Sequence, residues 1–278
     1  MPRAGPRSLL GKAGAYLVLS ALSLIVLFPI YMTLVRALST PAVYVREGQP
    51  LYPVAIQWDV WSRAWNLGDL DQKILVSAVV TVVIVAGQLL TSILAAYAFA
   101  FLDFPLKRVV FVLFMATLML PIEVTLIPNV STIRELGWLN SYPGLTGPFL
   151  ATAFGTFLIR QGFLGVPRDL RDAAQLDGYG HLAFLWRVAI PITRPVIASF
   201  TVIAFLAAWN QYTWPRAVVT EGRWETIQIG LKSLSAATVE QGNIALAAAL
   251  IAALPVLALL IFLQRQLIRG LTAGAVKG

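Results

Sequence analysis

Six long apolar stretches constrain the fold of this chain more than any other feature of its sequence. A helix needs about 20 apolar residues to cross the hydrocarbon core of a bilayer, and six segments meet that requirement. They are approximately 13–35, 74–101, 109–128, 145–164, 188–213 and 244–264. Stretches such as VVFVLFMATLML lack the alternation of a β-barrel strand, and backbone amides within a membrane must bond inside their own segment. The sequence therefore predicts an all-α integral membrane protein with six transmembrane helices in a single domain, residues 1–278.

The composition agrees with a membrane protein and excludes several other classes. Hydrophobic residues make up 58% of the chain and charged residues only 12%, whereas soluble domains are about 25% charged. The net charge is +8, but the basic residues are scattered, so we expect no nucleic-acid partner. The chain contains no cysteine, which excludes disulfides, thiolate metal sites and a cysteine nucleophile.

The first apolar stretch has two possible interpretations. Basic residues precede it, namely Arg3, Arg7 and Lys12, as they precede both signal peptides and retained helices. Its apolar run is longer than the roughly 7–15 residues of a signal peptide. We therefore interpret 13–35 as a retained transmembrane helix.

The basic residues also predict the orientation of the chain. If both termini lie inside, the inner segments hold most of the arginines and lysines, including Lys107, Arg108 and Arg160. Such an excess is typical of cytoplasmic loops. Trp58 and Trp65 then fall in the first outer loop, in keeping with the preference of tryptophan for membrane interfaces. The sequence predicts a multi-pass protein with both termini in the cytoplasm.

A polar insert at 167–187 separates the fourth and fifth apolar stretches. Pro167 followed by Asp169 is typical of the start of a helix. Gly178 and Gly180 are typical of its end. The pattern predicts a short helix on the cytoplasmic surface.

One face of this predicted helix is suited to close contact. The residues that share it at helical spacing are Leu170, Ala173, Ala174 and Asp177. The two alanines allow another surface to approach closely. The sequence leaves two alternatives open: a helix that docks onto a partner, and an amphipathic helix that rests on lipid headgroups.

The insert and the start of the next stretch carry a spaced motif. Its members are Asp172-Ala173-Ala174, Gly178 and Val188-Ala189-Ile190-Pro191. This arrangement resembles the "EAA" loop of the permease subunits of bacterial binding-protein-dependent ABC importers, in which Glu-Ala-Ala, Gly and Ile-x-Leu-Pro have the same spacing. Asp172, Val188 and Ile190 replace the Glu, Ile and Leu of that motif, and each keeps its charge or apolar character.

The resemblance covers most of the chain. Within these importers, the chain is most similar to the carbohydrate-uptake family, and there to the second permease subunit of the maltose and glycerol-3-phosphate importers. The segments that carry it are TLMLPIEVTLIPNV (117–130), LNSYPGLTGPFLATAFGTFLIRQGFL (139–164), WNQYTWP (209–215) and LQRQLIRGL (263–271). It implies a type I ABC importer permease fold in a bacterial inner membrane, with a cytoplasmic coupling helix.

The resemblance also implies partners and cofactors. We expect a second homologous permease, two copies of a cytoplasmic ATPase, an extracytoplasmic solute-binding protein and membrane lipid. ATP and Mg²⁺ would bind to the ATPase, and this chain would bind no cofactor. The residues implied in coupling to the ATPase are Asp172, Ala173, Ala174, Asp177, Gly178 and Pro191.

A second group of polar and aromatic residues lies at the predicted outer ends of the third and fifth helices. Its members are Glu123, Asn129, Trp209, Asn210, Gln211 and Tyr212. Polar side chains within membrane helices face a cavity or a partner, so the group is a candidate translocation path. Snorkelling of the carboxylate and interfacial anchoring of the aromatic rings are the alternatives.

The sequence favours a transport subunit over an enzyme. A P-loop requires G-x-x-x-x-G-K-[ST], and the Gly11-Lys12 pair is followed by Ala13. We find no catalytic set and no metal site. The alternatives are a self-contained channel or secondary transporter, which would not need a docking helix, and an intramembrane enzyme. For the solute, we expect glycerol-3-phosphate or a glycerophosphodiester, followed by a sugar.

Overall fold

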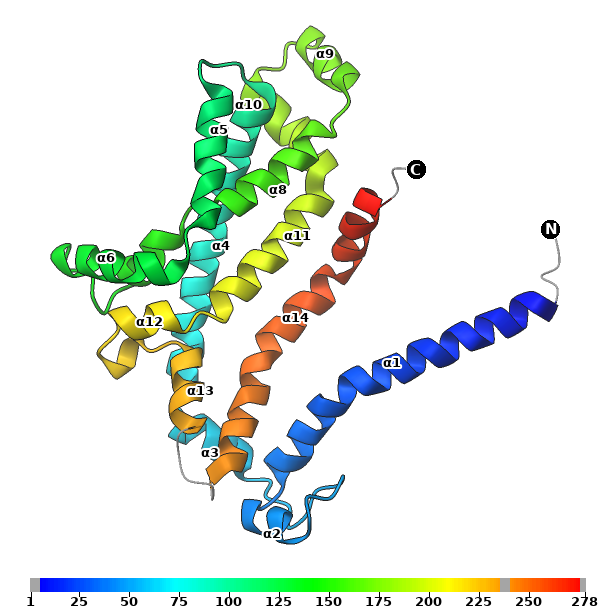
Figure 1. The fold of residues 1–278 in the computed structure, drawn as a ribbon, viewed down its shortest axis with the longest axis vertical. Coiled ribbons are helices and arrows are strands. Elements are labelled where there is room, and N and C mark those ends of the chain that lie inside the picture. The colour runs from blue at the N-terminus through cyan, green and yellow to red at the C-terminus, as the bar shows by residue number, and fades with distance from the viewer. Residues whose placement is uncertain (1–5, 236–240, 276–278) are drawn as a thin grey trace. The chain divides into compact units, whose positions relative to one another are not determined.

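The computed structural model describes the backbone of residues 6–235 and 241–275, which is mostly helical (Figure 1). The longer helices are α1 (Pro6–Leu38), α4 (Leu70–Phe101), α5 (Lys107–Ala116), α6 (Ile122–Glu135), α8 (Ala153–Leu164), α9 (Arg168–Leu176), α11 (Ile190–Trp209), α13 (Ile227–Ser235) and α14 (Gly242–Ala275). The shorter ones are α2 (Pro41–Arg46), α3 (Val60–Leu67), η1 (Thr117–Met119), α7 (Tyr142–Thr146), η2 (Gly147–Phe149), α10 (His181–Phe184), the π-helix η3 (Leu185–Ala189), α12 (Thr213–Val218) and η4 (Gly222–Trp224). The predicted all-α class is confirmed.

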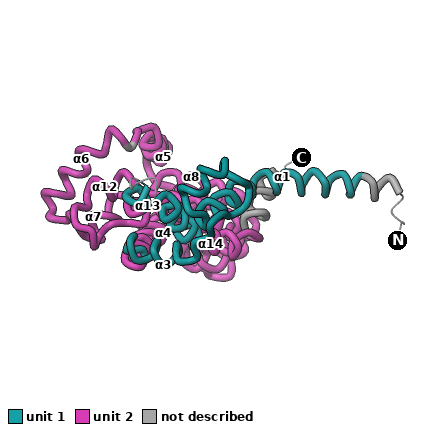
Figure 2. The backbone as a smooth tube through the Cα atoms, turned by 90° about the horizontal axis from the view of Figure 1, so that it is seen from below, with its two compact units in different colours: residues 1–70, 231–253 teal, residues 71–230, 254–278 magenta. Residues whose placement is uncertain are grey.

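The chain forms two compact units (Figure 2). Residues 1–70 and 231–253 make the first, and residues 71–230 and 254–278 make the second. All the candidate site residues lie in the second unit. The single permease domain that we expect from the sequence stays a prediction.

Several helices are long and apolar enough to cross a membrane. In the described part of the chain they are Gly11–Leu38, Leu70–Phe101, His181–Trp209 and Gly242–Arg265. A fifth crossing arises if the bent pair Lys107–Met119 and Glu123–Glu135 acts as one span. The multi-pass class is therefore confirmed, but the predicted number of six spans is not.

The predicted helix at 109–128 is wrong as one continuous element. The chain forms α5 and η1, then bends by 98° into α6, and Figure 1 shows α6 turned steeply away from α5. The break lies at Leu120 and Pro121, which both have extended backbone. Proline has no amide hydrogen to donate within a helix, so Pro121 stands at the start of a new helix instead.

The predicted helix at 145–164 is also interrupted. Residues 142–149 form α7 and η2, Thr152 is extended, and α8 begins only at Ala153. With 12 residues, α8 is about 18 Å long at 1.5 Å per residue, which is shorter than the hydrocarbon core. Gly147 and Pro148 explain the interruption, because glycine weakens a helix and proline disrupts it. The prediction of one continuous helix rested on the apolar length of the segment and did not take these two residues into account.

The helix predicted at 188–213 has different ends. It begins at His181 and reaches α11 through the wider π turn of η3. Pro191 lies in the first turn of α11, where its missing amide hydrogen removes one helical bond. The helix ends at Trp209, so Asn210 and the two residues after it lie outside the helix.

An aromatic cluster joins the helices of the second unit. Phe101 of α4, Phe163 of α8, Phe184 of α10 and Phe200 of α11 are buried together. A Cβ atom on Gly155 would overlap the Phe200 ring, so α8 and α11 approach closely at that glycine. The cluster holds together α8 and α10, the two helices that precede and follow α9 in the chain.

Candidate functional site

Helix α9 lies within the polar insert and begins and ends where the sequence predicts. Pro167 occupies the N-cap position with an extended ψ of 137°. At the other end Gly178 has a φ of +76°. The Gly178 amide donates to the Gln175 carbonyl at 3.0 Å, and the Tyr179 amide donates to the Ala174 carbonyl at 2.8 Å. These two bonds are a Schellman motif, in which the residue with positive φ is usually glycine.

One side of α9 is attached to the rest of the second unit. Ala174 is only 5% exposed and belongs to the aromatic cluster. Arg171 donates from Nη2 to the Phe101 carbonyl at the end of α4, at 3.2 Å, and its guanidinium lies 5.9 Å from the centre of the Phe101 ring. The hydrogen bond links α9 to a long helix that is a candidate span.

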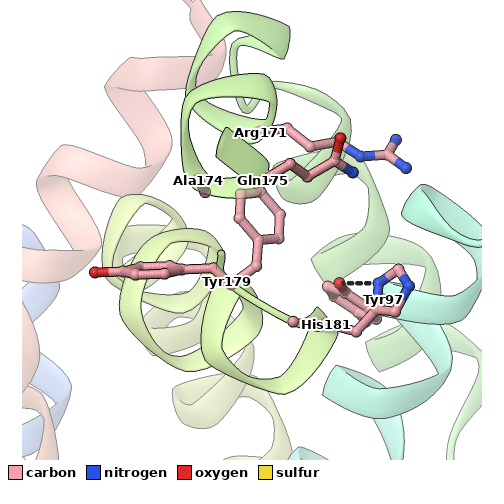
Figure 3. A pocket seen from close by; sticks show the side chains of 8 residues that line it. Tyr97, Arg171, Ala174, Gln175, Tyr179 and His181 are labelled. Atoms are coloured by element: carbon pink, nitrogen blue, oxygen red, sulfur yellow. Dashed lines mark hydrogen bonds between the residues drawn. The ribbon is translucent and has the colours of Figure 1, made fainter. Parts of the chain in front are cut away.

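A second link runs beneath α9. The Tyr97 hydroxyl and His181 Nδ1 lie 3.0 Å apart, and Figure 3 shows these two side chains facing each other. They line a cavity of about 90 Å³ together with Arg171 and Gln175 of α9. The hydrogen bond joins α4 to the start of α10 and thereby anchors the connection that follows α9. Nothing in the sequence pointed to Tyr97, because it lies in an apolar stretch.

The other side of α9 is exposed. Asp172, Ala173 and Asp177 are exposed, and Leu176 is 90% exposed. Asp172 forms no ion pair within the described part of the chain. The sequence pattern did not single out Leu176.

The two alanines of the motif face different surroundings. Ala173 is exposed, whereas Ala174 faces the interior of its own unit. The expected face that also contains Leu170 and Asp177 is therefore divided. The small side chain of Ala174 allows α9 to pack on its own chain, and only Ala173 is available to a partner.

The candidate path residues at the end of α11 lie close together in the sequence but differ in exposure. Trp209 is buried, and its ring stacks on Phe205 at 5.8 Å between centroids. Asn210 donates from Nδ2 to the Leu206 carbonyl at 2.9 Å and accepts from Gln228 Nε2 at 3.2 Å. These contacts make Asn210 the side-chain cap of α11.

The next two residues along the chain leave α11. Gln211 is partly buried, and its Oε1 has no hydrogen-bond partner among the described residues. Tyr212 is exposed. A buried amide oxygen without a partner is costly, so the Gln211 side chain has an acceptor available for a ligand or a water.

The other two candidate path residues lie on α6. Glu123 is exposed in the first turn of α6, where a carboxylate stabilises the positive end of the helix dipole. Asn129 lies one to two turns later and is partly buried. α6 and α12 pack in one apolar cluster, in which Leu126 contacts the group around Trp214. The structure thus places α6 beside the segment that follows α11, and the role of these residues in a path stays a prediction.

The fold and the site define a class of protein. Several helices are long and apolar enough to cross a membrane, and a short polar helix, α9, is tied to the end of one of them with its other side exposed. These features define an integral membrane protein with one exposed polar helix. The chain belongs to the family described as binding-protein-dependent transport system inner membrane component, which matches residues 87–273.

Curated relatives support the same family. The chain is 34% identical over 256 residues to the sn-glycerol-3-phosphate transport system permease protein UgpE of Yersinia pestis bv. Antiqua, covering 89% of this chain and 91% of that protein. It is 35% identical over 257 residues to the UgpE of Rhizobium meliloti, with the same coverage. The UgpE of Pectobacterium atrosepticum is 36% identical over 256 residues, again covering 89% and 91%.

One solved structure shares the fold. It is a bacterial ABC transporter involved in the import of the acidic polysaccharide alginate, with a TM-score of 0.78 and 22% identity, covering 95% of this chain and 99% of that one. The chain is therefore a permease subunit of an ABC importer, as the spaced motif predicts. It belongs to a family of transport permeases, and the alternatives of an enzyme or a self-contained channel are not favoured.

Proposed function

We propose that this permease carries sn-glycerol-3-phosphate or a closely related glycerophosphodiester, and that α9 is the helix through which a cytoplasmic ATPase drives it. The observation that supports coupling is the two-sided placement of α9. Ala174 is buried on one side of the helix and Leu176 is almost fully exposed at its end. A force on the exposed side therefore passes into the chain's own core.

The contacts around α9 give this force a route. Arg171 ties α9 to the end of α4, and the Tyr97–His181 bond ties α4 to the start of α10. Because α10, η3 and α11 follow each other without a break, a displacement of α9 moves two long helices together. Such rigid connection is what alternating access requires of a coupling element.

The exposed residues of α9 suit a cleft on a partner. Asp172 supplies a carboxylate for a basic residue of the ATPase, and Ala173 and Leu176 supply small and apolar contacts. ATP and Mg²⁺ bind to that partner, not to this chain. The complete importer contains two ATPase copies, a second homologous permease and an extracytoplasmic solute-binding protein.

The substrate proposal is supported by the relatives. Three proteins at 34–36% identity are named as permeases for sn-glycerol-3-phosphate. A sugar remains the second candidate, because the segments that resemble the carbohydrate-uptake family extend to both kinds of importer.

The proposed orientation places α9 and both termini in the cytoplasm of a bacterial inner membrane. The termini themselves, residues 1–5 and 276–278, lie outside the described residues. Because the chain has no cysteine, single cysteines can be labelled without background. Leu176→Cys should react with a membrane-impermeant maleimide only from the cytoplasmic side, and Trp58→Cys only from the other side. Labelling of Leu176→Cys from the outer side contradicts the orientation and the coupling role.

Transport itself is tested in proteoliposomes that contain the complete importer. We expect ATP-driven uptake of sn-glycerol-3-phosphate in the presence of the cognate binding protein, and much slower uptake of maltose. Uptake without the ATPase would overturn the proposal. Uptake of maltose that is faster than uptake of sn-glycerol-3-phosphate would show that the proposed substrate is wrong and that a sugar is the substrate.

A further inference from the structure

A basic cavity lies outside α9, where the end of α4, the start of α5 and α8 meet. It has a volume of about 450 Å³, within the range of about 300–1,000 Å³ typical of small-ligand sites. Three cationic side chains line it: Lys107, Arg108 and Arg160. Asp103 is the single carboxylate in its lining. None of the contacts that support the coupling role involves this cavity.

Arg160 is held in place by the chain. Its Nε donates to the Phe99 carbonyl at 3.2 Å, and its guanidinium lies 4.4 Å from the centre of the Phe111 ring. No carboxylate in the described part of the chain pairs with it. The guanidinium is therefore fixed and keeps its charge available, which favours recognition of an anion such as a phosphate.

The two residues at the start of α5 add further charge. Lys107 donates from Nζ to the Leu102 carbonyl at 2.6 Å and lies 3.7 Å from Asp103, whose side chain is fully exposed. A pair with such an exposed partner is weak, so the cavity keeps a net positive charge. The N-cap position of α5 is Leu106, whose side chain cannot accept from the first amides, and these amides also favour an anion.

An apolar groove continues from this cavity along α5. Val109, Val112 and Leu113 line it, with Arg108 at its edge. Its volume is about 260 Å³, and Val112 is 64% exposed. A soluble phosphate ester has no apolar part to fill such a groove, but an acyl chain next to its phosphate does.

We propose that this site binds an anionic glycerophospholipid. The phosphate lies among Arg160, Lys107 and Arg108, and one acyl chain follows the groove at Val112. Basic pockets between transmembrane helices are suited to such headgroups. The assignment to the cytoplasmic leaflet rests on the proposed function, because that orientation places Lys107 and α9 on the same side.

Lipid binding can be measured on the complete importer after detergent delipidation. Native mass spectrometry titrates phosphatidylglycerol against phosphatidylcholine with the same acyl chains. We expect tighter binding of phosphatidylglycerol, and a loss of about tenfold or more in Arg160→Gln, since a charge-assisted hydrogen bond is removed. Arg194→Gln is the matched control, because Arg194 is exposed on α11 and does not line the cavity.

The groove is tested separately. Val112→Ser should weaken binding of a phosphatidylglycerol with long chains and leave that of a dihexanoyl lipid unchanged. Because Val112 is exposed, this variant keeps the fold of α5.

Several results overturn the lipid site. They are equal binding of the two headgroups, an equal loss in Arg194→Gln, displacement of the lipid by free sn-glycerol-3-phosphate, and no retained lipid because a partner subunit covers α5. Failure of the coupling role looks different. It shows as normal ATP-driven transport in variants of α9, while lipid retention is unaffected.

Discussion

The Tyr97 hydroxyl and His181 Nδ1 lie 3.0 Å apart, although 84 positions separate the two residues. Tyr97 belongs to α4 and His181 begins α10, so this bond connects the helix before the α5–α9 segment with the helix after it. Together with the bond from Arg171 to the Phe101 carbonyl, it attaches both α9 and the start of α10 to α4. The proposed coupling therefore involves residues that need not touch the ATPase.

Tyr97→Phe removes this hydrogen bond and keeps the ring. We expect a loss of about 1 kcal/mol in stability and fewer solute molecules transported per ATP hydrolysed. The uptake-to-hydrolysis ratio in proteoliposomes measures the second effect. A double-mutant cycle with His181→Ala provides the control, because two residues that share one bond give less than additive losses. If the losses in the uptake-to-hydrolysis ratio were fully additive, the Tyr97–His181 bond would have no part in linking ATP hydrolysis to transport.

Substitutions of Gly178 test whether the end of α9 needs glycine for its backbone conformation or for lack of space. A Cβ atom there would meet nothing within 4 Å, but its φ is +76°. Asparagine tolerates such a φ, and β-branched residues do not. Gly178→Val should therefore distort the end of α9 and lower uptake at least several-fold, while Gly178→Asn keeps most of it. If both variants transport equally well, the Schellman motif is not needed for coupling.

The two alanines should respond differently to the same charge. Ala174→Asp places a carboxylate in the aromatic cluster, where an unsatisfied polar group costs at least about 1–3 kcal/mol, so we expect less folded protein in the membrane. Ala173→Asp lies on the exposed side and should leave the amount of protein normal. Its expected defect is weaker recovery of the ATPase on co-purification. Quantitative immunoblotting of membranes and of the purified complex distinguishes the two.

The sequence was most informative where local residue chemistry decides the structure. Pro167 and Gly178 predicted both ends of α9, because proline favours the start of a helix and glycine accepts the positive φ that ends it. It was least informative within apolar segments. Pro121 and Gly147 end or interrupt helices there, yet apolar length alone suggested continuous spans at 109–128 and 145–164. Hydropathy measures suitability for lipid and says little about where backbone bonds break.

Long-range partners were also beyond the sequence. Ala173 and Ala174 are adjacent and identical, and only the fold shows that one is exposed and the other buried. Tyr97 lies in an apolar stretch, with nothing nearby to suggest a bond to His181. The spaced motif identified the family, but the structure shows how its residues divide between bracing α9 and facing outward.

An ion pair outside α9 makes a further prediction. Lys73 is only 8% exposed, and its Nζ lies 3.4 Å from Glu225 Oε2. Glu225→Ala leaves a largely buried ammonium without this carboxylate, which we expect to lower thermal stability in detergent. The double variant Lys73→Met/Glu225→Ala should recover much of the loss, since apolar replacements of buried pairs are often tolerated. A double variant that is less stable than Glu225→Ala refutes this explanation.

Two variants at the end of α11 distinguish a role of Asn210 in the translocation path from its role as the cap of the helix. Asn210 caps α11 through the Leu206 carbonyl and accepts a hydrogen bond from Gln228. Gln228→Ala removes only the second contact, and Asn210→Ala removes both contacts together with a polar group at the end of the helix. If Asn210 lines the path, Asn210→Ala should raise the KM for solute uptake several-fold at normal complex assembly, and Gln228→Ala should change it little. Equal effects on KM, accompanied by equal losses of thermal stability, would instead assign Asn210 to holding α13 against α11.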